Sequence, residues 1–147
     1  MFEAIITVTI SLGSILLFCY WFRYACRLIL SAATSQDYAT SVAQAHQLCF
    51  QQAQMRLRQG AMELDRLKDM LDQDYTALAR LMSQAEGTQD GIERRMLAIH
   101  YSLTAAWYRT SSRISTSAAR MALDEMSMVV AHFANSLGEA AASSAAA

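Results

Sequence analysis

Residues 4–22 of the sequence read AIITVTISLGSILLFCYWF, nineteen consecutive residues without a charge. A helix of this length is roughly 28 Å long at about 1.5 Å per residue, close to the ~30 Å hydrocarbon core of a bilayer. The stretch therefore predicts a transmembrane helix. Together with its flanks it defines a membrane anchor and interfacial extension over residues 1–34, to which the rest of the chain is attached.

Aromatic and basic residues mark the C-terminal boundary of this span. Trp21 lies among tyrosines and phenylalanines of the kind that favour the lipid–water interface, and Arg23 and Arg27 follow it one helical turn apart. Because these arginines follow the span and no basic residue precedes it, the positive-inside rule places the bulk of the chain in the cytoplasm. A cleaved signal peptide is the competing interpretation, since residues 31–33 (SAA) resemble a cleavage site. The start of the segment is not basic, however, and both arginines precede that site.

Small and hydroxyl side chains lie along the predicted span. Thr7, Ser11 and Ser14 share one helical stripe, and Thr9 and Gly13 form a small-xxx-small pair. Such residues let two helices approach closely in lipid, so they are candidates for transmembrane packing. The alternative is that the hydroxyls bond back to carbonyls of their own helix.

Composition predicts an all-α fold for the part of the chain that follows. About 110 residues are enough for one small domain. The chain has no proline and only five glycines, so both strong helix breakers are scarce. The formal net charge of −1 argues against strong overall attraction to nucleic acid.

Apolar spacing predicts that residues 35–138 form an antiparallel hairpin of two long, coiled-coil-like helices. The first is expected over about 37–86 and the second over about 91–137, joined by a glycine-containing turn and followed by a flexible Ala/Ser tail at 139–147. The first helix carries leucines or phenylalanine every seven residues, and folding the chain at the turn brings apolar residues of the second helix opposite them. This hairpin seam consists of Phe50, Leu57, Leu64, Leu71, Leu78, Ile99, Leu103, Trp107, Ile114, Met121 and Met128.

Two helices bury only one stripe each, so we expect the hairpin to be completed by oligomerisation or by a partner protein. Each predicted helix has further apolar side chains off the seam. The partner-surface candidates are Met55, Met62, Tyr101 and Tyr108.

The sequence contains no motif typical of catalysis or cofactor binding. The three histidines, His46, His100 and His132, are far apart along the helices and do not predict a metal site. A segment with aromatic residues and arginines near Arg109 and Arg113 could contact phosphate or RNA, but it also fits pairing with the acidic residues of the first helix. We therefore expect no catalytic residue, no cofactor, no metal, no small-molecule substrate and no nucleic acid.

These features predict a non-enzymatic single-pass membrane protein that acts as a structural or interaction subunit. Its expected partners are membrane lipid and protein, either further copies of the chain or a larger membrane complex. One alternative is an accessory subunit of an electron-transfer or photosynthetic complex without a cofactor of its own. Another is a membrane-anchored signalling module.

Overall fold

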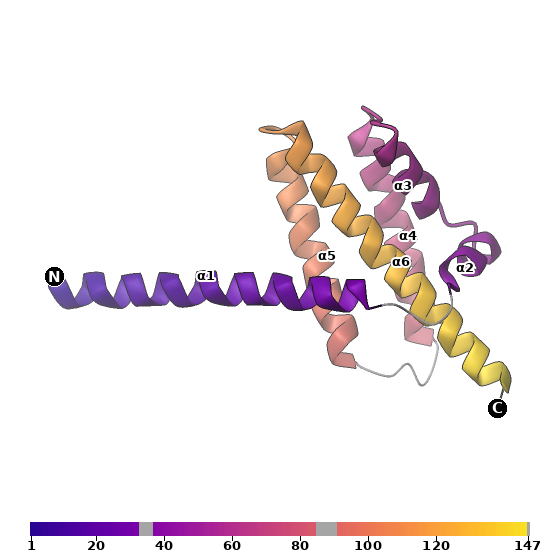
Figure 1. Ribbon diagram of the computed structural model, residues 1–147, viewed down its shortest axis with the longest axis horizontal. Helices are drawn as coiled ribbons and strands as arrows, with labels where there is room; N and C mark the ends of the chain where they lie inside the picture. Colours follow the sequence, from indigo (N-terminus) through magenta and orange to yellow (C-terminus); the bar gives the residue numbers. More distant parts are fainter. Residues whose placement is uncertain (33–36, 85–90, 147) are drawn as a thin grey trace. The chain divides into compact units, whose positions relative to one another are not determined.

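The structure is a computed structural model that describes residues 1–32, 37–84 and 91–146 (Figure 1). These residues form six α-helices and include no strand, which confirms the all-α class. The chain divides between Ala32 and Ala33 into two compact units. The expected turn around Gly87 and the final residue, Ala147, lie outside the described residues.

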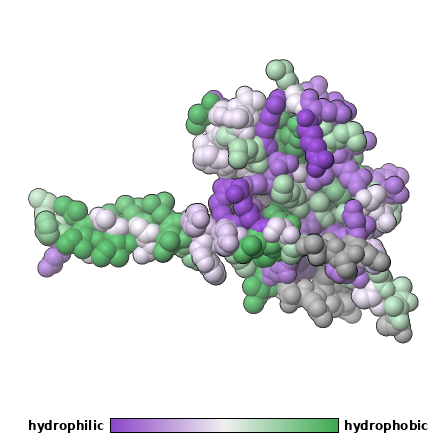
Figure 2. Space-filling model, in the orientation of Figure 1, coloured by the Kyte–Doolittle hydropathy of each residue, from purple (hydrophilic) through white to green (hydrophobic). Residues whose placement is uncertain are grey.

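The first unit is a single helix, α1 (Phe2–Ser31). It is long and apolar enough to cross a membrane, and none of the residues in its apolar window is buried. Figure 2 shows mostly hydrophobic residues on the visible face of α1, with a few residues of intermediate hydropathy among them. The prediction of an N-terminal apolar helix is confirmed, and the helix continues past the apolar run through Arg23 and Arg27.

The second unit is a bundle built around its last helix. It contains α2 (Ala39–Ala45), α3 (Phe50–Arg58), α4 (Leu64–Gln84), α5 (Gly91–Ser111) and α6 (Thr116–Ala146). α6 packs against each of the other four helices. Its buried side chains include Leu123, Met126, Val129, Val130 and Phe133, which form the centre of the core.

The expected first long helix is divided into α2, α3 and α4. α3 ends where Gly60 takes a left-handed conformation with φ 78°. The N–H of Ala61 then donates to the carbonyl of Arg56 at 3.0 Å, which closes a C-terminal motif that favours glycine. α2, which ends at Ala45, is similarly followed by a left-handed residue, Gln47, with φ 53°, a conformation uncommon outside glycine.

The expected second long helix is divided at residues 112–115 into α5 and α6. The Oγ of Ser115 lies 3.4 Å from the N–H of Ala118 and accepts a hydrogen bond from it, so this hydroxyl caps the start of α6. α6 then folds back along α5 and continues to Ala146, through the segment expected to be a flexible tail. That segment is rich in alanine, the residue with the highest helix propensity.

This fold-back changes which residues form the core. Phe50, Leu71 and Leu78 are fully buried, and Leu57 and Leu64 are half-buried. The seam residues of the expected second helix are instead exposed. Those on α5 lie on the opposite side of the helix from Leu97, Tyr101 and Tyr108, which are buried in the bundle. The exposed seam residues are Ile99, Leu103, Trp107, Ile114, Met121 and Met128.

Candidate functional site

Tyrosines of α5 bind carboxylates of α4 and hold the two helices together. The hydroxyl of Tyr101 donates to Oδ1 of Asp72 at 2.8 Å, and that of Tyr108 donates to Oδ1 of Asp65 at 2.8 Å. The two tyrosines are seven residues apart, as are the two aspartates, and the later tyrosine bonds the earlier aspartate. α4 and α5 are therefore antiparallel, as in the expected hairpin.

Burial and charge control the ionisation of these tyrosines. The pKa of Tyr101 is raised well above its ordinary 10.0, mainly by burial and further by the hydrogen bond and charge of Asp72. The pKa of Tyr108 is raised for the same reasons, with Asp65 as the carboxylate. Tyr75 stacks on Tyr101, with ring centroids 3.9 Å apart and planes 3° apart. Tyr101 and Tyr108, which were predicted to face a partner protein, are thus buried and stabilise the bundle from within.

A third carboxylate, Asp74 of α4, serves the start of α3. Its Oδ2 accepts a hydrogen bond of 2.7 Å from the N–H of Cys49, the residue that precedes α3. Burial raises the pKa of Asp74, while hydrogen bonds from the backbone of Cys49 and Phe50 oppose that rise. The backbone N–H groups at the start of α3 are thus bound by a carboxylate of a neighbouring helix instead of by a side chain next to them in the sequence.

Two histidine–glutamate pairs link α5 to α6. Nε2 of His132 lies 3.2 Å from Oε1 of Glu93, and Nε2 of His100 lies 3.8 Å from Oε2 of Glu125. The two residues on α5 are seven apart in sequence, as are the two on α6, and the earlier residue of α5 pairs with the later one of α6. α5 and α6 are therefore antiparallel neighbours. Among the described residues, no group of three or more His, Cys, Asp or Glu side chains is arranged to hold a metal ion.

The structure places the predicted transmembrane-packing residues along one exposed helix. The hydroxyl of Thr7 donates to the carbonyl of Glu3 at 2.9 Å, and that of Thr9 donates to Ile5 at 2.8 Å. These two hydroxyls are satisfied within their own helix, as the alternative interpretation holds. Gly13 has open space around its Cα. Ser11, Ser14 and Trp21 are exposed on the same helix.

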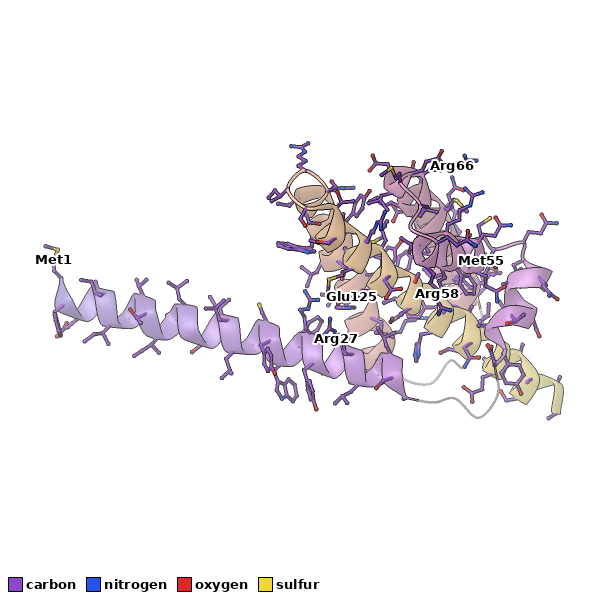
Figure 3. The ribbon with its side chains drawn as sticks, turned by 45° about the horizontal axis from the view of Figure 1, so that its top comes forward. Met1, Arg27, Met55, Arg58, Arg66 and Glu125 are labelled. Atoms are coloured by element: carbon purple, nitrogen blue, oxygen red, sulfur yellow. The ribbon has the colours of Figure 1, made fainter. Side chains whose placement is uncertain are left out.

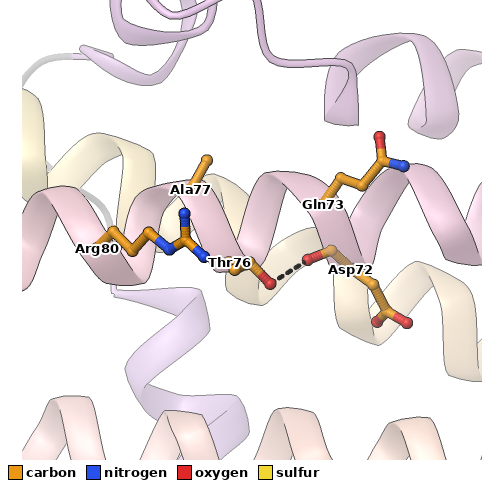
Figure 4. Close-up of a pocket in the computed structure, with 5 residues that line it drawn as sticks. All are labelled: Asp72, Gln73, Thr76, Ala77 and Arg80. Carbon is orange, nitrogen blue, oxygen red and sulfur yellow. Dashed lines mark hydrogen bonds between the residues drawn. The ribbon is translucent and has the colours of Figure 1, made fainter.

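One open hollow lies along α4. It is lined by Asp72, Gln73, Thr76, Ala77 and Arg80, all from this one helix (Figure 4). The hydroxyl of Thr76 donates to the carbonyl of Asp72 at 2.8 Å, so it is bound to its own helix. The hollow brings together no set of groups from different elements that would activate a substrate.

Exposed apolar side chains lie at one end of the bundle, on one side of α5, and at Met121 and Met128 of α6. The first, which we call the tip, consists of the turns at residues 59–63 and 112–115, which lie at the same end of the bundle (Figure 1). Met62 and Ile114 are 91% and 81% exposed there. Nη2 of Arg120 donates to the carbonyl of Gly60 at 2.9 Å and so ties the first turn to α6. Met55, labelled in Figure 3, is exposed on the adjacent α3.

The second place is one side of α5, which we call the α5 outer face. It is made of Ile92, Met96, Ile99, Leu103 and Trp107. The spacing of these residues places them on one stripe of the helix, and all are exposed except the half-buried Met96. Sequence reasoning assigned three of these residues, Ile99, Leu103 and Trp107, to the seam.

Sequence reasoning also missed the role of Asp65 and Asp72 as tyrosine acceptors, although the matched spacing of seven was present in both helices. It paired the acidic residues of the first helix with Arg109 and Arg113, which are exposed on α5 and in the turn that follows it. No protein-family model, curated protein or solved structure matches this chain.

Proposed function

We propose that this chain is a non-enzymatic single-pass membrane protein, anchored by α1, whose cytoplasmic helical bundle binds a partner protein as a structural or interaction subunit. The observation that carries the proposal is the tip, where Met62 and Ile114 are almost fully exposed at one end of a closed bundle. Large apolar side chains cost free energy when they contact water, and a partner that buries them recovers it.

The kind of side chain at the tip supports a binding role. Methionine is flexible and polarizable, so it adapts to the shape of a partner. Met62 lies in a turn whose backbone is held by Arg120, so the side chain is presented from a fixed position. Met55 is a further exposed methionine on the adjacent α3.

The membrane part of the proposal rests on α1, whose apolar window is unburied. The cytoplasmic orientation rests on Arg23 and Arg27, which follow the apolar run. A bundle in the cytoplasm is protected from protease added to intact cells and is cleaved once the cells are opened. Cleavage in intact cells would reverse the assigned orientation.

Binding of a partner protein is tested by photo-crosslinking with the full chain in its native membrane. A photo-crosslinking amino acid replaces Met62 or Ile114, and a matched control replaces Ser83, which is exposed on α4. We expect both tip positions to crosslink to the same protein and Ser83 not to. The particle extracted in mild detergent should then be heavier than the 16.3 kDa chain.

Two results would contradict the proposal. One is a particle that contains a single copy of the chain and no other protein. The other is an absence of adducts from both tip positions when incorporation at each is complete. Adducts of equal yield from Ser83 and from the tip would show random collision instead of a defined surface.

A further inference from the structure

The α5 outer face is a second apolar surface, distinct from the tip. Ile99, Leu103 and Trp107 are each more than half exposed, at 53%, 57% and 53%, and Ile92 is 75% exposed. The core-facing side of the same helix is already filled by Leu97, Tyr101 and Tyr108. α5 therefore has apolar residues on two sides and only one of them is buried in the bundle.

One flank of this face carries positive charge. Arg95 and Arg109 are exposed on α5. Arg95 and Arg109 are fourteen residues apart, so they lie on the same flank of the apolar stripe. The acidic residue of α5, Glu93, lies 3.2 Å from His132 on the opposite flank. A helix with tryptophan and aliphatic residues on one side and arginine at its edge is typical of segments that lie at a membrane surface.

Charge argues against one protein occupant of this face, a second copy in antiparallel packing. If two copies packed through their α5 outer faces in antiparallel fashion, Arg95 of one copy and Arg109 of the other would lie on the same side of the contact. Like charges placed together are unfavourable. Anionic lipid headgroups would instead pair with these arginines while the acyl region accepted Trp107 and Leu103.

The covalent connection to α1 favours the same occupant. Only five peptide steps separate Ala32 from Asp37, and a chain extends at most about 3.6 Å per residue, so the connection is at most roughly 18 Å long. A domain tethered to a bilayer by a short connection meets its surface at high effective concentration. Weak attraction is then sufficient for binding.

We propose that the α5 outer face binds the surface of the anionic bilayer in which α1 is embedded. The inference rests on the anchoring role of α1 in the proposed function, and it adds a lipid contact for the bundle that the tip does not provide. Trp107 enters the interface, and Arg95 and Arg109 bind headgroup phosphates.

The two tryptophans of the chain, Trp21 and Trp107, allow a direct test. The full chain is reconstituted in vesicles whose acyl chains carry bromine, which quenches tryptophan fluorescence on contact. Trp21→Phe leaves Trp107 as the reporter of the α5 outer face, and Trp107→Phe leaves Trp21 as the reporter of α1. The vesicles contain phosphatidylcholine alone or phosphatidylcholine mixed with phosphatidylglycerol.

We expect lipid to quench Trp21 in both kinds of vesicle, and to quench Trp107 strongly where phosphatidylglycerol is present. High salt should reduce the quenching of Trp107, because it screens the arginines. Arg95→Gln and Arg109→Gln should each weaken the lipid-bound state by about five-fold, the equivalent of ~1 kcal/mol per arginine near an anionic surface. Arg66→Gln, at an exposed position of α4, is the matched control and should change nothing.

Each of the other possible results shows which part of the proposal is wrong. Quenching of Trp21 without quenching of Trp107 would overturn the lipid contact and leave the anchor intact. Absence of quenching of Trp21 would overturn the anchoring role itself. Protection of Trp107 from aqueous acrylamide without quenching by lipid would show that protein, such as a second copy, covers the face. Equal weakening by Arg66→Gln would show that general charge, and not this face, causes binding.

Discussion

The hydroxyl groups of Tyr101 and Tyr108 explain how α4 and α5 are joined although both helices pack mainly on α6. Asp72 accepts hydrogen bonds from Tyr101 and from Lys68, so one carboxylate serves two donors. Tyr101 is 4% exposed and Tyr108 is 2% exposed. Buried hydroxyls need partners, and a carboxylate is a strong acceptor.

We expect Tyr101→Phe to keep the stacked rings but to lower the free energy of unfolding by about 1–2 kcal/mol, because a hydrogen bond to a carboxylate is lost. Chemical denaturation at neutral pH measures this change. Tyr75→Phe is the control, since it leaves the stack and the bond to Asp72 in place. An unchanged stability of Tyr101→Phe would mean that the bond contributes nothing.

The same variant has a predicted pH dependence. The pKa of Tyr101 in the folded protein is raised above 10.0, its ordinary value. Its contribution to stability is therefore full below pH 10.0 and is lost as the pH rises toward the folded-state pKa. Stability of the wild-type protein should fall more steeply above pH 10.0 than that of Tyr101→Phe.

At the scale of the element, Gly138 lies where α2 packs closely against α6. A Cβ added at Gly138 would lie 2.4 Å from Cβ of Tyr38 and 3.1 Å from Cγ2 of Val42. The N–H of Tyr38 also donates to Oδ1 of Asn135 at 2.7 Å, so the start of α2 is held at this place. The second helix was expected to end at about residue 137, but α6 continues through Gly138, which provides space for α2.

We expect Gly138→Ala to destabilise the bundle by about 1–3 kcal/mol through overpacking, even though alanine favours helix over glycine. Thermal unfolding measures the loss, and hydrogen exchange should show it first in α2. Gly91→Ala is the matched control, because a Cβ there meets nothing within 4 Å. A stabilised Gly138→Ala protein would show that α2 shifts to admit the methyl group.

Helix content was predictable from the sequence, and helix ends were predictable only in part. The scarcity of glycine and proline predicted helix throughout, but Gly60 marked a turn that the heptad pattern obscured. Gln47 adopts a left-handed conformation without a residue type that would predict it. The cap of α3 comes from Asp74, which is distant in sequence, so local reasoning had no access to it.

For the candidate surfaces, too, the sequence predicted the pattern of apolar residues but not which of them are buried. Apolar periodicity identified Ile99, Leu103 and Trp107 as one stripe, which is correct as a pattern. Whether the stripe is buried or exposed depends on α6 folding back at residues 112–115, and periodicity has no information about that direction. The exposure of Met62 follows from its position in a turn at the end of α3.

At the scale of the whole molecule, the bundle has its own core. The buried apolar residues of the second unit run from Ala39 to Ala134, and α6 connects all of its helices. A domain with its own core is expected to fold independently of its neighbours.

We therefore expect residues 37–147 alone to be helical and to unfold in one cooperative transition without detergent. Circular dichroism during heating measures this. Leu71→Asp in the same fragment is the disrupted reference, since it places a charge at a fully buried position at a cost of several kcal/mol. Gradual melting of the unmodified fragment would mean that the bundle needs α1 or its partner to fold.

The central position of α6 has a consequence for biosynthesis. Every helix that α6 covers is made before it, so the nascent chain presents the apolar sides of α2, α3, α4 and α5 while the ribosome is still translating. Incomplete chains of this kind aggregate readily. The bundle can close only after α6 has left the exit tunnel, by which time α1 has already been available to the membrane insertion machinery.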